Sequence, residues 1–184
     1  ILTLLLSVAF RTGSKKQTSL PPFPEHWRSL LDEQSVFYQE LDTNGKTAFE
    51  KRIQAFLQQT RVTGVNTPVE ELDKVLIGAS AIIPVFSFPD WEYINLREVL
   101  LYPDSFNEEF ELEQGKERPV LGMVGNGALQ HVMILSQPSL RQGFTNRTDK
   151  NNTAIHEFVH LIDKTDGGVD GVPENLLSKQ YILP

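Results

Sequence analysis

Two histidines near the C-terminal end of the chain stand four residues apart and frame a glutamate. His156, Glu157 and His160 form the pattern H-E-x-x-H. On an α-helix, residues i and i+4 lie on the same face, so both imidazoles can reach a single metal ion. Glu157 can then act as general base toward a water bound to that metal. The pattern predicts one catalytic Zn²⁺ held by His156 and His160; the alternative is an amphipathic helix whose histidines make ordinary hydrogen bonds.

The residues around this motif favour the helix that it needs. Apolar residues recur at helical spacing through the motif, and Thr153 or Asn152 can serve as the N-cap, which predicts a helix over residues 152–164. Cysteine is absent from the sequence, so imidazole and carboxylate are the protein ligands left for a metal. We therefore predict a zinc metallopeptidase that hydrolyses peptide bonds through a zinc-bound water, with Glu157 as the base.

Length and composition fit one soluble enzyme domain, and the motif predicts a peptide or protein as its substrate. The chain has 184 residues, 40% of them hydrophobic and 22% charged, which is enough to bury a core of its own. The formal net charge is −7 and the sequence contains no long basic run. This excludes nucleic acid as the main partner, because binding to phosphates requires a basic surface.

The N-terminal segment has a different character from the rest of the chain. Residues 1–10 are nearly all apolar and are followed by Arg11, Lys15 and Lys16. Ten residues are fewer than the roughly twenty that span a bilayer, so we expect the end of a membrane anchor that continues upstream. Basic residues behind it place the domain in the cytoplasm, anchored to the inner membrane. A signal peptide or a buried first element are the alternatives.

Domain organisation follows from the rest of the sequence. Residues 11–24 are rich in Ser, Thr, Lys and Pro and are predicted to form a linker, and residues 25–184 form the enzyme domain. Within that domain, the spacing of apolar residues and the Pro and Gly residues that end each segment predict helices and then short strands before the motif helix. The helices are expected at 25–31, 44–61 and 69–83, and the strands at 99–102, 121–124 and 132–135.

This order predicts an α+β fold, with N-terminal helices, a small mixed sheet and the H-E-x-x-H helix. It agrees with the zincin plan of metallopeptidases, in which an edge strand lies along the cleft and pairs with the extended substrate. Residues 121–124 or 131–136 could form that strand, and both could equally be interior strands.

Several stretches together resemble the Mlc titration factor A family of bacterial zinc-dependent peptidases. The likeness spans roughly residues 22–175, and its motifs are H-E-F-V-H-L-I-D at 156–163, G-V-P at 171–173, R-E-V-L-L-Y-P at 97–103, A-F-L-Q-Q at 55–59 and H-V-M-I-L at 131–135. The resemblance implies a zincin fold, His156 and His160 as zinc ligands, and Glu157 as the catalytic base. It also implies interaction with a transcriptional regulator of sugar-uptake genes.

The third protein ligand of the zinc is the part of the site that the sequence leaves open. A catalytic zinc usually takes three protein ligands, and the resemblance implies a glutamate on a later helix. We expect that helix to follow Pro184, where the chain given ends. The local alternatives are Asp166 and Glu174, whereas Asp163 is on the same helical stripe as His156 and suits a hydrogen bond to a histidine N–H.

Two further expectations concern residues outside the motif. His131 could line the cleft but is better explained as a strand-end residue, and neither Tyr102 nor Tyr181 is singled out as a residue that polarises the substrate carbonyl.

The alternative function is a non-catalytic protein that binds a regulator and keeps a vestigial or structural zinc site. Glu157 favours the enzyme, because a structural site has no use for a base.

Overall fold

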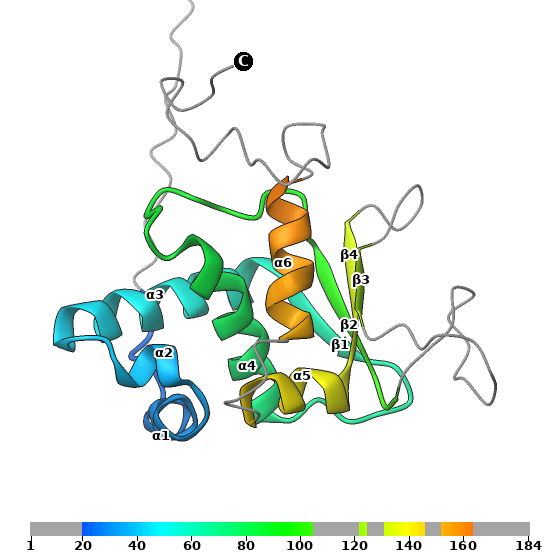
Figure 1. Cartoon of the computed structure of the whole chain (residues 1–184), viewed down its shortest axis with the longest axis horizontal. Helices are drawn as coiled ribbons and strands as arrows, with labels where there is room; N and C mark the ends of the chain where they lie inside the picture. Colours follow the sequence, from blue (N-terminus) through cyan, green and yellow to red (C-terminus); the bar gives the residue numbers. More distant parts are fainter. Residues whose placement is uncertain (1–19, 105–121, 125–130, 146–151, 164–184) are drawn as a thin grey trace, which may run out of the picture.

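The computed structural model describes residues 20–104, 122–124, 131–145 and 152–163, and these form an α+β domain as the sequence predicts. Helices gather on one side of the domain and a small mixed sheet lies on the other, with the motif helix α6 (Thr153–Asp163, orange in Figure 1) between them. The expectations for residues 1–19 and 164–184 lie outside the described residues.

The helices that precede the sheet begin where the sequence supplies caps. Asp42 accepts a hydrogen bond from the backbone N–H of Gly45 (2.7 Å), and Glu70 forms a capping box with Asp73. Because Glu70 is the N-cap, the predicted helix at 69–83 starts at Glu71. The helical elements are α1 (Glu25–Gln34), α2 (Val36–Gln39), α3 (Thr43–Gln59), α4 (Glu71–Ile82) and the 3₁₀ turn η1 (Ile83–Val85).

The sheet has four strands among the described residues, in the order β1-β2-β4-β3. β1 pairs with β2 and β2 with β4 in parallel, whereas β3 is antiparallel to β4. The three predicted strands are confirmed as β2 (Glu98–Tyr102), β3 (Gly122–Val124) and β4 (Val132–Ser136); β1 (Arg61–Gly64) was not predicted.

This strand order decides which strand borders the motif helix. β4 lies inside the sheet, between β2 and β3, whereas β3 is one of the two edge strands among the described residues. Helix α6 packs against β3 as well as against α4, η1 and α5 (Gln137–Thr145) (Figure 1). Of the two strands proposed for the cleft, β3 is therefore the one at the edge and beside α6.

The core is built around α4, which is buried along almost its whole length. Close contact with α3 depends on Gly78, because a Cβ at that position would lie 2.7 Å from Cγ2 of Ile53. On the other side of the core, the apolar strands β2 and β4 contribute fully buried side chains such as Leu101 and Met133. A rigid central helix and a buried sheet thus form the base on which α6 is held.

A search of the described helices finds none that is both long and apolar enough to cross a membrane. The expected end of an anchor, residues 1–10, lies outside the part of the chain that the structure describes.

Candidate metal centre

Helix α6 starts at a cap that also fixes it to α5. Oδ1 of Asn152 accepts a hydrogen bond from the backbone N–H of Ile155 (3.0 Å), so Asn152 is the N-cap, one of the two predicted candidates. Its Nδ2 donates to the carbonyl of Gly143 in α5 (3.1 Å). A Cβ on Gly143 would lie 2.8 Å from Cγ of Asn152, so the absence of a side chain there permits the contact. One side chain therefore sets both the start and the position of α6.

The buried face of α6 anchors the helix through one aromatic side chain. Phe158 is 0% exposed, and its ring packs edge-on against Phe56 (centroids 5.6 Å apart) and Tyr93 (5.2 Å). At about 100° per residue, Phe158 lies roughly opposite the midpoint between the two histidines. Packing of Phe158 into the core therefore directs His156 and His160 away from the core.

The two motif histidines converge on one point. Nε2 of His156 and Nε2 of His160 lie 2.9 Å apart, and the rings meet at 78°. His156 is exposed and His160 half-buried. Two imidazole nitrogens bound tetrahedrally to one zinc at about 2.0–2.1 Å would stand about 3.3 Å apart. The observed Nε2–Nε2 distance of 2.9 Å is that of a hydrogen bond between the rings. Binding of one shared zinc requires the two Nε2 atoms to separate by only a few tenths of an ångström.

Two carboxylates of α6 lie near the histidines in the sequence. Glu157 is 8% exposed and follows His156 directly, so it is offset by about 100° around the helix. Asp163 is the last residue of α6 and is 5% exposed. The described residues contain no group of three His, Cys, Asp or Glu side chains that could hold a metal. The other local candidates for the third ligand, Asp166 and Glu174, lie outside the described part.

The other residues considered from the sequence, His131, Tyr102 and Tyr181, are not on helix α6. Nδ1 of His131 is 2.8 Å from the carbonyl oxygen of Asn95, and the carbonyl of His131 accepts from the N–H of Arg97 (2.9 Å). His131 thus fixes the chain at the amino end of β4, in agreement with the strand-end role. Tyr102 is the last residue of β2, and Tyr181 is outside the described residues.

Comparison with known sequences decides the family. The sequence model of the family described as glucose-regulated metallo-peptidase M90 matches residues 10–182, nearly the whole chain. The chain belongs to this family. It is the Mlc titration factor A family that the motifs resemble. The family is one of metallopeptidases, and this class implies a bound metal.

The alignment with one relative covers nearly the same part of the chain as the family model. The chain is similar to the "Uncharacterized protein slr2042" of Synechocystis sp. (strain ATCC 27184 / PCC 6803 / Kazusa), with 28% identity over 197 aligned residues. The alignment covers 95% of this chain and 68% of that protein. The likeness therefore runs through the helices, the sheet and the motif helix rather than resting on the motif alone.

Proposed function

We propose that this protein is a zinc-dependent peptidase of the zincin type, with His156 and His160 as zinc ligands and Glu157 as general base. The observation that carries the proposal is the convergence of the two Nε2 atoms, 2.9 Å apart on the outward face of a helix anchored in the core. Imidazole Nε2 is a common zinc ligand, and H-E-x-x-H on a helix is the arrangement that metallopeptidases use.

Each residue has a separate task in this proposal. His156 and His160 would hold the metal, and a third ligand would come from residues outside the described part of the chain. Zinc, when bound, would lower the pKa of a coordinated water to about 7 and would polarise the substrate carbonyl. Glu157 accepts a proton from the attacking water and delivers it to the leaving amine. Its small exposed fraction, 8%, keeps most bulk solvent away from the carboxylate.

Strand β3 is assigned to hold the substrate. It is an edge strand of the described sheet, it runs antiparallel to β4, and it packs against α6. Edge strands have backbone groups available for a further strand, so an extended peptide can add to β3 through main-chain hydrogen bonds. This would place the peptide backbone along the motif helix without requiring a particular substrate sequence.

The metal assignment is tested by elemental analysis of the natural full-length protein. We expect about one zinc per chain, and a sharp loss of zinc in both His156→Ala and His160→Ala. The matched control is His26→Ala, because His26 is an exposed histidine on α1 with its Nε2 3.7 Å from Oε2 of Glu71. Unchanged zinc content in both motif variants would refute the assignment.

Two parts of the proposal concern the protein in its cell. Family resemblance supports a transcriptional regulator as a partner, and the apolar residues 1–10 support attachment of a cytoplasmic domain to the inner membrane. Fractionation of cells that express the natural protein tests the second point, because a protein recovered entirely without membranes would contradict it.

A further inference from the structure

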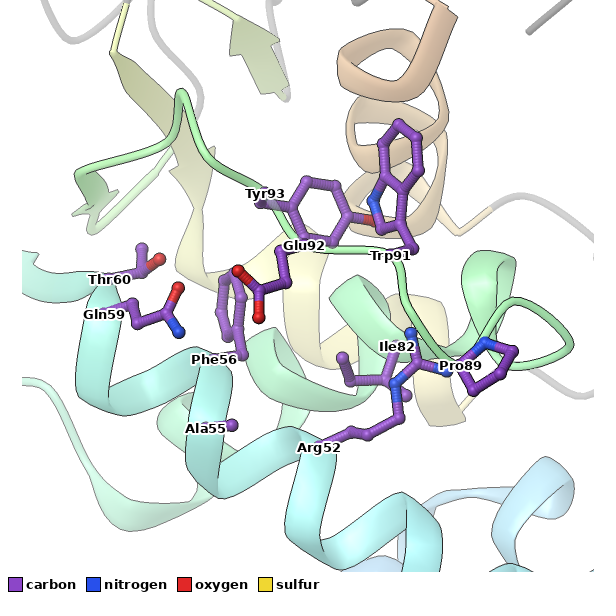
Figure 2. A pocket seen from close by; sticks show the side chains of 10 residues that line it. All are labelled: Arg52, Ala55, Phe56, Gln59, Thr60, Ile82, Pro89, Trp91, Glu92 and Tyr93. Carbon is purple, nitrogen blue, oxygen red and sulfur yellow. The ribbon is translucent and has the colours of Figure 1, made fainter. Parts of the chain in front are cut away.

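A pocket with no role in the proposed reaction lies on the other side of α6 from the histidines. It encloses about 140 Å³ between α3, the end of α4 and residues 89–93. Figure 2 shows three aromatic side chains in its wall, Phe56, Trp91 and Tyr93. Two of them, Phe56 and Tyr93, are the rings that pack against Phe158. The pocket is therefore separated from His156 and His160 by the thickness of the helix.

Arg52 brings a positive charge into this pocket without a matching negative one. Its Nη1 donates to the carbonyls of Val85 (2.9 Å) and Phe86 (3.1 Å), whereas its buried Nη2 has no hydrogen-bond partner among the described residues. No carboxylate in the described part of the chain forms an ion pair with Arg52. Burial lowers the pKa of Arg52, as expected for a guanidinium that has lost water and gained no anion. Such a group is costly unless an acceptor meets it.

Trp91 adds a second buried donor to the same pocket. Its Nε1 has no partner within the described residues. The neighbouring Tyr93 differs, because its hydroxyl already donates to the carbonyl of Ala81 (2.8 Å). Native proteins leave few buried donors unpaired, and both of these donors belong to residues that line the pocket.

The one carboxylate in the wall does not supply that acceptor. Figure 2 shows the carboxylate of Glu92 apart from the guanidinium of Arg52. Glu92 is exposed, so its charge is largely satisfied by solvent. The described part of the chain thus gives Arg52 no carboxylate partner.

We propose that this pocket binds a small organic carboxylate with a flat apolar body. A carboxylate accepts two hydrogen bonds at once from a guanidinium, and such bonds are among the strongest in proteins. The rings of Phe56, Trp91 and Tyr93 suit an apolar body, which an inorganic anion lacks.

The experiment is a fluorine NMR titration of the full-length protein labelled with fluorotryptophan. The chain has two tryptophans, and the variant Trp27→Phe assigns the signal of Trp91. Sodium benzoate added to ~10 mM, which would nearly saturate a site with a Kd of about 1 mM, should shift the Trp91 signal saturably and leave that of Trp27 in place. Benzyl alcohol and sodium sulfate should each bind at least about ten-fold more weakly, because one lacks the charge and the other the ring.

Three variants locate the site. Arg52→Gln should weaken benzoate binding at least about ten-fold. Because Arg52 also holds the carbonyls of Val85 and Phe86, Ala55→Leu is the second variant: it fills the pocket and removes no hydrogen bond. Its matched control is Gln58→Leu, since Gln58 is exposed on the same helix and does not line the pocket.

The outcomes separate this pocket from the metal centre. His156→Ala should bind benzoate as the wild type does. If benzoate were instead bound to the metal, its binding would be lost in this variant together with the metal. Benzoate binding that survives unchanged in both Arg52→Gln and Ala55→Leu would overturn the proposal. So would the absence of any saturable shift of the Trp91 signal, or equal affinity for benzoate and benzyl alcohol.

Discussion

Replacement of Phe158 by alanine tests how the motif helix is held in place. Phe158 is fully buried and packs against the rings of Phe56 and Tyr93. The change leaves His156, Glu157 and His160 intact. The matched control is Val159→Ala, because Val159 is the adjacent residue and is 46% exposed.

The expected loss can be worked from the packing. A buried Phe→Ala change costs about 3–5 kcal/mol, since it removes apolar contact and leaves a cavity. That is a large part of the roughly 5–15 kcal/mol by which a domain is stable. Val159→Ala should cost less than about 1 kcal/mol, because an exposed side chain loses little contact.

Urea unfolding followed by circular dichroism measures both variants. With a slope of about 3 kcal/mol per molar urea, Phe158→Ala should lower the midpoint by about 1–2 M. Both proteins should be measured in the presence of a metal chelator, so that loss of metal binding does not add to loss of packing. A loss of under about 1 kcal/mol for Phe158→Ala, or equal losses for the two variants, would refute the anchoring of α6 through Phe158.

Three shorter predictions concern other contacts. Asn152→Ala should destabilise the domain by about 1 kcal/mol through the lost cap of α6, and equal stability of variant and wild type in urea would contradict this. Arg141→Met should lower the free energy of unfolding by about 2–4 kcal/mol, because it leaves the fully buried Asp73 without its two hydrogen bonds from Arg141 (2.8 and 3.0 Å). Lys74→Met breaks an exposed ion pair and should lower it by under about 1 kcal/mol. Similar losses in the two variants would contradict this difference. Hydrogen bonds from Lys74 and Trp27 hold the pKa of Glu71 below its ordinary value near 4.5. The contribution of Glu71 to folding stability is therefore present above that pH and is lost as the pH falls through the folded-state pKa. Glu71→Gln should lower the free energy of unfolding more at pH ~6 than at pH ~3.

The sequence predicted the long elements because their patterns are strong. Helices α3 and α4 repeat apolar residues at helical spacing, and the strands β2 and β4 are apolar runs between turn residues. The motif itself located α6, and the N-cap Asn152 was one of two predicted candidates. Local pattern was enough in these places, because burial and local propensity favour the same structure.

The missed elements are short ones that tertiary contacts stabilise. β1 has four residues directly after α3, and its first residue, Arg61, was predicted to continue that helix. Helix α5 contains Pro138 and Gly143, which lower helix propensity. It forms because Ser136 accepts a hydrogen bond from the N–H of Ser139, and because Leu140 and Phe144 are buried. Neither contact can be read from local pattern alone.

The candidate site was predictable only where one helix carries it. His156, Glu157 and His160 are close in sequence, so helical spacing is sufficient to bring them together. The pocket was missed because Arg52 and Trp91 are 39 residues apart and line one pocket only through the packing of the segment after η1 on α3. The sequence around Trp91 contains no signal that this residue lines a pocket together with Arg52.

Peptide hydrolysis by Glu157→Gln measures the central claim most directly. The change keeps size and polarity but removes the carboxylate that accepts the proton. We expect a folded full-length variant with the zinc content of the wild type and peptide hydrolysis lower by about 10²–10⁴-fold. Equal hydrolysis by variant and wild type would contradict the role of Glu157. A wild type that binds zinc and its regulator but cleaves no member of a broad peptide panel would contradict the assignment as an enzyme.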